Sequence, residues 1–347
     1  MNMIDIHSHF LPRSWPDLAA RFGGAPWPWM KHLGPAQAML MCGTQEFRPV
    51  SSACWDPAVR LEAMDRDGVE VQVMCVTPLL FAYQRPATQA LECARIFNDA
   101  AREMCGHAPA RLKSLCQVPL QDTDLACREL SRAMADGHVG VQIGNHVGGR
   151  ELNDAGIITF LQHCAAEGAA VFVHPWDMMG QERMGKYQLP WLVSMPAETQ
   201  LSILWLILSG AFERLPRSLK LCFAHGGGSF PYLLGRVDNA WQHRDIVRQD
   251  CPQLPSSYVD RFYVDAAVFS ADALGLLIKT MGEDRVMLGS DYPFPLGEQQ
   301  VGALIRGDRT LTARVRGKLL QTNAAAFFGL PASATPMADG FGAVRRA

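Results

Sequence analysis

Short apolar runs and longer amphipathic stretches alternate along almost the whole chain. Eight runs are rich in apolar and β-branched residues, at 3–7, 69–76, 112–118, 139–143, 170–174, 219–225, 262–266 and 286–291. Helix-like stretches follow them, including 57–66, 88–107, 124–136, 154–167, 199–212 and 271–281. Apolar strands that alternate with amphipathic helices indicate a parallel sheet covered on its outer face. Eight such units predict an α/β fold, a closed (β/α)8 TIM-type barrel.

Two long segments interrupt this alternation. An insertion at about 11–55, rich in Pro, Gly and Trp, follows the first strand, and residues 175–198 follow the fifth. Because both come directly after strands, we expect them to stand over the carboxyl end of the barrel, where active sites form. We expect residues 1–330 to form one barrel domain. Residues 331–347, rich in Pro, Ala and Gly, are expected to be a flexible C-terminal tail.

Composition and charge limit the classes of function. A net charge near −2 argues against nucleic acid as a partner, because no basic surplus is present. The ten cysteines include no C-x-x-C pair and are expected to be reduced thiols. The first ten residues lack a signal-peptide pattern, and the apolar run 201–208 is too short to cross a bilayer. We therefore expect a cytoplasmic protein without a membrane partner.

Polar residues end several of the predicted strands. The first strand ends in the pair His7 and His9, whose side chains can both face the barrel axis because alternate strand residues point the same way. The fifth strand ends at His174, the sixth at His225 and the eighth at Asp291. Any one of them could simply hydrogen-bond to a loop. Together, imidazoles and a carboxylate at the catalytic end of a barrel predict a site for a zinc-type divalent ion.

A few other polar residues are candidates for the same site. His146 follows the fourth strand and could add a ligand. Arg48 and Arg236 lie among apolar neighbours, where a guanidinium could clamp a substrate carboxylate. Alternatively, Arg236 could form an ordinary ion pair with Asp238 or Asp265. The charged residues of 60–67 and 314–318 are expected to be solvated helix faces.

Several longer motifs are similar to one enzyme family, the 2-amino-3-carboxymuconate-6-semialdehyde decarboxylases of the amidohydrolase superfamily. They are Asp-Ile-His-Ser-His-Phe, Phe-Arg-Pro-Val, Gln-Val-Pro-Leu-Gln-Asp, Val-His-Pro-Trp-Asp-Met-Met-Gly, His-Gly-Gly-Gly-Ser-Phe, Gly-Arg-Val-Asp-Asn-Ala-Trp and Gly-Ser-Asp-Tyr-Pro-Phe-Pro. The resemblance runs from His7 to about Leu330. One departure concerns 42–46, which lack the lysine that some members carry before the matched arginine.

The resemblance implies a role for each candidate. One zinc ion per subunit would be held by four ligands, His7, His9, His174 and Asp291. The fourth strand lacks the lysine that bridges two metals in binuclear relatives, which favours a single ion; cobalt, iron or manganese could replace zinc. His225 would be the acid/base. Carboxylate-binding arginines would be Arg48 and, from the neighbouring subunit of a homodimer, Arg236. The pocket walls would include Trp176, Met178, Trp191 and Phe294.

The expected reaction is non-oxidative decarboxylation of 2-amino-3-carboxymuconate-6-semialdehyde to 2-aminomuconate semialdehyde. Metal-bound water, with its pKa lowered towards about 7, would act with His225 as acid and base. Two other enzyme readings remain open: a related decarboxylase of a hydroxybenzoate-like acid, and a zinc hydrolase of a cyclic amide or lactone. A metal-stabilised scaffold without activity is the non-enzyme alternative. The complete set of five site residues counts against the scaffold.

Overall fold

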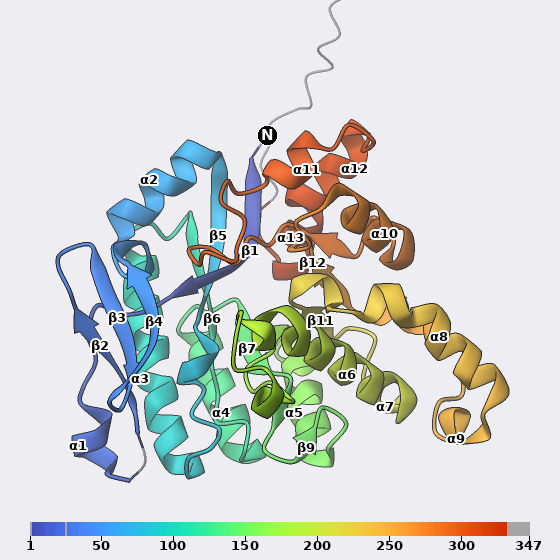
Figure 1. The fold of residues 1–347 in the computed structure, drawn as a ribbon, viewed down its shortest axis with the longest axis horizontal. Helices are drawn as coiled ribbons and strands as arrows, with labels where there is room; N and C mark the ends of the chain where they lie inside the picture. The colour runs from blue at the N-terminus through green and yellow to red at the C-terminus, as the bar shows by residue number, and fades with distance from the viewer. Residues whose placement is uncertain (1, 25, 332–347) are drawn as a thin grey trace, which may run out of the picture.

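The protein is described by a computed structural model that covers residues 2–24 and 26–331; the predicted tail lies outside the described residues from 332 onwards. Its centre is an eight-stranded parallel barrel (Figure 1). The strand order is β1 (Met3–Phe10), β5 (Val69–Val76), β6 (Leu112–Cys116), β7 (Gly140–Gly144), β10 (Ala170–His174), β11 (Lys220–Phe223), β12 (Tyr263–Asp265) and β13 (Val286–Met287). Hydrogen bonds from Ile6 N–H to the Leu288 carbonyl (3.0 Å) and from Asp291 N–H to the His7 carbonyl (2.8 Å) join the last strand to the first. The predicted (β/α)8 barrel is confirmed.

The strands begin close to their predicted positions, but two of them end before the polar residue that was predicted to close them. β11 stops at Phe223 and β13 at Met287, before the polar residues that the sequence placed at their ends. His225 and Asp291 both have left-handed backbones, with φ of 55° and 61°. A residue in that conformation cannot continue a β-ladder, so both side chains are carried on turns directly above the strands.

Helices pack around the outside of the barrel. They are α2 (Pro57–Asp67), α3 (Ala87–Gly106), α4 (Thr123–Ala135), α5 (Ala155–Ala166), α6 (Met195–Leu208), α7 (Ala211–Arg214), α8 (Phe230–His243), α9 (Asp245–Arg248), α10 (Ala271–Met281), α11 (Ala303–Gly307), α12 (Ala313–Gly317) and α13 (Asn323–Phe328). Local sequence explains their ends. Asp56 caps α2 by accepting from Ala58 N–H (2.9 Å), and Gly68 ends that helix in the left-handed conformation. The single helix expected over 199–212 is broken by Gly210, whose φ is 66°.

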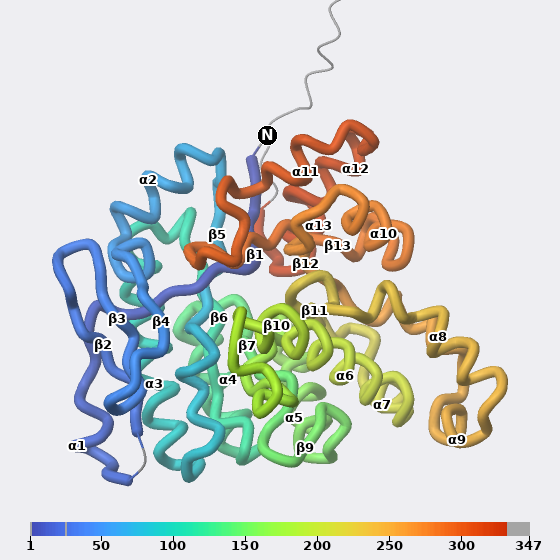
Figure 2. Tube along the Cα trace, in the orientation of Figure 1, coloured from blue at the N-terminus to red at the C-terminus, as the bar shows by residue number. Residues whose placement is uncertain are grey.

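The first insertion has a fold of its own. After α1 (Leu18–Phe22), strands β2 (Pro28–His32), β3 (Gln37–Cys42) and β4 (Gln45–Ser51) form an antiparallel sheet that the sequence did not predict. The tube view follows the chain out of the barrel after β1, through this sheet and back at α2 (Figure 2). A two-stranded ribbon, β8 (His146–Val147) with β9 (Arg150–Glu151), follows β7.

Short helical turns complete the connections. They are Ser52–Cys54, Pro78–Leu80, Gln181–Arg183, Pro190–Ser194, His225–Gly227, Pro255–Arg261 and Lys318–Thr322. The continuous helical stretch Pro190–Leu208 is long and apolar enough to cross a membrane by those two measures alone. It contains buried Glu198 and packs Ile203, Leu206 and Ile207 into the core, as a covering helix of a barrel does. It therefore packs against the barrel as one of its covering helices.

One expectation about charge is wrong. Arg60 is fully buried and Asp67 is 3% exposed, so 60–67 is not a solvated helix face throughout. The Arg60 guanidinium reaches beneath the carboxyl end of β1, where it donates to Gln72 Oε1 (2.7 Å) and to the His9 carbonyl. All ten cysteines are free thiols, and eight of them are buried.

Candidate metal and catalytic site

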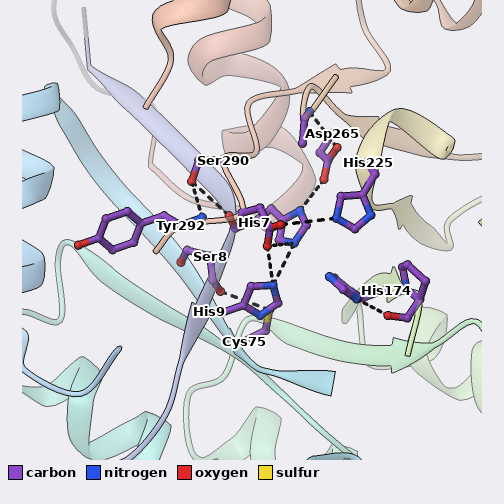
Figure 3. Close-up of polar contacts among 12 residues, drawn as sticks. His7, Ser8, His9, Cys75, His174, His225, Asp265, Ser290 and Tyr292 are labelled. Carbon is purple, nitrogen blue, oxygen red and sulfur yellow. Dashed lines mark hydrogen bonds and ion pairs between the residues drawn. The ribbon is translucent and has the colours of Figure 1, made fainter. Parts of the chain in front are cut away.

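Four of the predicted residues bring one ligand atom each to a single point. They are His7 and His9 from β1, His174 from the end of β10 and Asp291 from the turn above β13, and their ligand atoms all lie within 4.8 Å of one another. The Nε2 atoms of His7 and His9 are 3.2 Å apart. Asp291 Oδ1 lies 2.9 Å from the Nε2 of His9 and 3.4 Å from that of His7. Figure 3 shows the imidazoles of His7 and His9 from β1 and that of His174 from β10 converging.

The opposite ring nitrogen of each of these histidines faces an acceptor. The Nδ1 of His7 lies 2.7 Å from Asp265 Oδ2, that of His174 lies 2.7 Å from the Pro175 carbonyl, and that of His9 lies 3.4 Å from the Val76 carbonyl. Protons on the Nδ1 atoms leave the Nε2 lone pairs directed at the common point, which is how metal-binding histidines are usually held. A Nε2 pair 3.2 Å apart suits two ligands of one divalent ion with bonds of about 2.1 Å. The residues therefore fit a metal ion.

The charge states favour cation binding at three of the four ligands. Burial lowers the pKa of His9 to about 4 and holds that of His174 well below its usual value, so both imidazoles are neutral. Burial alone would raise the pKa of Asp291, but its contacts with His225 and His9 keep it ionised. His7 differs. Burial is the largest single effect and opposes its protonation, yet the Asp265 hydrogen bond together with the charges of Asp291, Asp265 and Asp5 raises the pKa of His7, so a proton competes with a metal there.

His225 stands beside this group without joining it. Its ring centroid is 5.2 Å from that of His7 and 5.0 Å from that of His174. Its nearest carboxylate oxygen, Asp291 Oδ2, is 3.8 Å from Nε2, beyond hydrogen-bonding distance. Neither ring nitrogen has a hydrogen-bond partner within the described chain, although both are buried. An imidazole held in this way can exchange a proton with a molecule above the four ligands.

A cavity of about 880 Å³ opens over these residues. His9, His174, His225 and Asp291 contribute to its lining. The four side chains predicted as pocket walls, Trp176, Met178, Trp191 and Phe294, also line it. Residues from both insertions border the cavity, as expected for segments above the carboxyl end of the barrel.

Arg48 enters the cavity from β4. Its guanidinium lies 4.2 Å from the centroid of the Phe294 ring, and Phe294 in turn stacks on the His9 ring at 5.0 Å. Burial lowers the pKa of Arg48, while the charge of Asp291 opposes this effect. An arginine titrates so far above neutral pH that it stays charged. The stack places one fixed positive charge on a mostly apolar wall beside the four ligands.

Arg236 lies elsewhere in the subunit. It is exposed on α8, which projects away from the barrel (Figure 1), and it does not line the cavity. The ion pairs of the described chain include none between Arg236 and Asp238 or Asp265, and those alternatives are wrong. His146 is also not a ligand. Its ring nitrogens face the Gly148 and Asp177 carbonyls at 3.1 and 3.2 Å.

Sequence reasoning missed Asp265, although the signal for it was present. Asp265 ends β12, as His174 ends β10, but it was considered only as a partner of Arg236. Its carboxylate is fully buried and accepts from the His7 ring at 2.7 Å. Burial is the largest single effect and opposes ionisation, but the contacts with His7, His225 and the Gly226 N–H together lower the pKa of Asp265, so the carboxylate is charged.

Comparison with known proteins agrees with this arrangement. The family model "Amidohydrolase" matches residues 4–330. A curated relative from Dictyostelium discoideum, 2-amino-3-carboxymuconate-6-semialdehyde decarboxylase, is 41% identical over 94% of this chain and 91% of its own. The chain belongs to this decarboxylase family of the amidohydrolase superfamily. It is accordingly a carboxy-lyase, an enzyme of non-oxidative decarboxylation.

Solved structures share the fold at lower identity. The apo form of the Metarhizium anisopliae enzyme IDCase matches with a TM-score of 0.81 and 23% identity, over 94% of this chain and 97% of that one. A dihydroxybenzoic acid decarboxylase from Polaromonas, with bound manganese and the inhibitor 2-nitroresorcinol, matches with a TM-score of 0.72 and 23% identity, over 95% and 97%. At this identity the likeness extends to the fold alone.

Proposed function

We propose that this carboxy-lyase acts on 2-amino-3-carboxymuconate-6-semialdehyde and releases carbon dioxide and 2-aminomuconate semialdehyde. The observation that carries the proposal is the juxtaposition of a charged arginine and a free imidazole in one cavity. Arg48 is positioned to hold a carboxylate, and His225 can move a proton beside the four candidate ligands. The 41% identity to the Dictyostelium decarboxylase supports this substrate. We place the reaction in the cytoplasm.

In the proposed mechanism, His7, His9, His174 and Asp291 hold one zinc-type ion. The ion, when bound, supplies Lewis-acid activation of water and neutralises developing negative charge. His225 would accept a proton from water and later donate it to the substrate carbon, and a proton from solvent would restore the water. The bond from that carbon to the departing carboxyl breaks, and its electron pair passes into the conjugated enamine–aldehyde system. The donated proton then takes the place of the lost carbon dioxide.

The substrate carries more than one anionic group, and Arg48 supplies one cation on the cavity wall beside the four candidate ligands. We propose that Arg236 from a second copy of the chain supplies another, in a homodimer. The support is that Arg236 is exposed on α8 without an ion pair in the described chain, next to Tyr232, which is 81% exposed. A projecting helix with an uncovered aromatic side chain and an unpaired arginine suits a subunit interface.

The first experiment must distinguish the proposed reaction from two other reaction classes. The first is a decarboxylase of a hydroxybenzoate-like acid; the Polaromonas structure is of a dihydroxybenzoic acid decarboxylase and contains bound manganese. A zinc hydrolase of a cyclic amide or lactone would use the same ligands and activated water. Arg48 favours an anionic substrate over a neutral ring.

The test follows the near-ultraviolet absorbance of freshly generated aminocarboxymuconate semialdehyde together with carbon dioxide release. As-isolated, metal-stripped and zinc-restored protein are compared, and manganese-, cobalt- and iron-restored samples identify the preferred metal. We expect decay and gas release that stop on stripping and return with zinc. His225→Ala should abolish turnover and retain zinc. The matched control His163→Ala changes a half-exposed histidine of α5 and should retain both. Intact substrate in the presence of a filled metal site would refute this substrate and leave the other two classes.

The dimer proposal has a separate test. Arg48→Ala and Arg236→Ala proteins should each be nearly inactive. If Arg48 acts within its own subunit and Arg236 across the interface, mixing and reassembling the two variants creates some sites that contain both arginines. Activity should therefore return on mixing. A mixture as inactive as its components would refute the shared site.

A further inference from the structure

Asp265 joins three parts of the site through one carboxylate. Its Oδ2 accepts from the Nδ1 of His7 at 2.7 Å. Its Oδ1 accepts from the backbone N–H of Gly226 at 2.9 Å and from that of Ala267 at 3.1 Å. The carboxylate thus connects β1, the end of β12 and the turn above β11, as Figure 3 shows between His7 and His225. It is fully buried and does not line the cavity, so it does not meet the substrate directly.

The turn that carries His225 has an uncommon backbone. Four successive residues, His225 to Gly228, have φ values of 55°, 62°, 75° and 62°. Left-handed backbone is unfavourable for a histidine, so the surrounding structure must hold it there. In the described chain, Asp265 is the side chain that hydrogen-bonds to the backbone of this turn. Because neither His225 ring nitrogen has a hydrogen-bond partner in the same part of the chain, backbone position determines where the imidazole lies.

The other oxygen of Asp265 determines the state of His7. By accepting at Nδ1, it keeps the His7 proton there and leaves the Nε2 lone pair for a metal ion. An amide in place of the carboxylate would act differently. Its oxygen would stay with the N–H groups of Gly226 and Ala267, and its NH₂ group would face His7. That group is a donor, so it would favour the tautomer with the proton on Nε2, where the metal should bind.

We propose that Asp265 is a positioning residue for both parts of the reaction. One oxygen prepares His7 as a metal ligand, and the other holds the turn that places His225. The inference rests on the proposed metal centre and extends it, because it couples metal binding to the placement of the acid/base through a single side chain.

Two substitutions separate the two effects. Asp265→Asn retains an acceptor for the turn but presents a donor to His7, while Asp265→Ala removes both acceptors. Glu129→Gln is the matched control, since Glu129 is also a buried carboxylate in an ion-pair network, on α4, and does not line the cavity. Zinc affinity is measured by competition with a chromogenic chelator, and kcat and KM are measured with zinc at saturation.

We expect Asp265→Asn to bind zinc about 10- to 100-fold more weakly than the unaltered protein, as loss of an outer partner of a metal ligand generally does. At saturating zinc, Asp265→Ala should have a kcat at least about tenfold below that of Asp265→Asn, because a displaced general acid loses part of its roughly 10²- to 10⁴-fold contribution. KM should change little, and Glu129→Gln should bind zinc normally.

Each result has a distinct meaning. Zinc affinity of Asp265→Asn equal to that of the unaltered protein would refute the role at His7. Equal kcat values for the two variants at saturating zinc would refute the role at the turn. If Asp265→Ala does not fold, cobalt-substituted Asp265→Asn still tests the ligand role, since an unchanged visible absorption spectrum and affinity would overturn it. If the unaltered protein binds no zinc, cobalt or manganese, the proposed metal centre fails, and this inference fails with it.

Discussion

The size of the loss in kcat/KM when Arg48 is replaced tests whether Arg48 binds a substrate carboxylate. The proposed contact is a charge-assisted, two-pronged hydrogen bond to a substrate carboxylate, and such bonds contribute about 1.5–3 kcal/mol each. The guanidinium is already positioned by its contact with Phe294 at 4.2 Å, so little ordering cost offsets that gain. Arg48→Lys keeps the charge but loses the planar fork and most of the stacking. A loss of about 2–4 kcal/mol in transition-state binding corresponds to a 30- to 1000-fold lower kcat/KM.

Initial rates over a range of substrate concentrations measure this change, and zinc content is measured on the same samples. Because Arg48 is not one of the four candidate ligands, Arg48→Lys should keep its zinc. Arg85→Lys is the matched control. Arg85 also lines the cavity and lies over an aromatic ring, that of Trp27 at 4.3 Å, but it belongs to the segment after β5. A kcat/KM for Arg48→Lys within about threefold of the original, corresponding to less than about 0.7 kcal/mol, would refute the proposed carboxylate contact.

Three further predictions concern metal binding and stability. A proton on His7 must leave before a metal binds, and the pKa of His7 is raised. Zinc affinity should therefore fall as the pH drops through that pKa. A zinc affinity that does not change between pH 8 and pH 5.5 would contradict this. Arg60→Met should lower the free energy of unfolding in urea by about 3–5 kcal/mol because it leaves buried acceptors unpaired, whereas Arg66→Met, at an exposed position, should not. Gly228→Ala should destabilise the protein and reduce kcat, since the added Cβ would lie 2.2 Å from a backbone oxygen. Gly275→Ala, with open space around it, should stabilise the protein by about 0.5–1 kcal/mol. Equal thermal stability of the two variants would refute this.

Most of the site could be predicted because it interrupts a regular pattern. A histidine or aspartate at the end of an apolar barrel strand has no packing reason to be there, so His7, His9, His174 and Asp291 were visible in the sequence. Asp265 followed the same rule and was overlooked, because it was considered only as a possible ion-pair partner of Arg236.

What the sequence did not predict depends on contacts between distant segments. Arg60 resembles any charged residue on an amphipathic helix, and its burial follows only from the acceptors that β1 and β5 present to α2. The antiparallel sheet of the first insertion is likewise obscured, since Pro28 and Pro49 lie within its strands and disrupt the apolar alternation. Arg236 shows a further limit. Its proposed partner is another copy of the chain, and no pattern within one copy determines that geometry.

The segments that carry the candidate metal ligands are joined by a buried polar network outside the barrel wall. Asp5 accepts from Ser290 N–H (3.0 Å) and Oγ (2.6 Å) and from the Gln72 amide (2.9 Å), while Arg60 donates to the Gln72 oxygen (2.7 Å). Asp5 and Ser290 immediately precede the segments that carry ligands from β1 and from the turn above β13. These bonds fix the two segments relative to each other at the seam where the barrel closes. The stability loss predicted for Arg60→Met should therefore be accompanied by weaker zinc binding, although its guanidinium touches no ligand side chain.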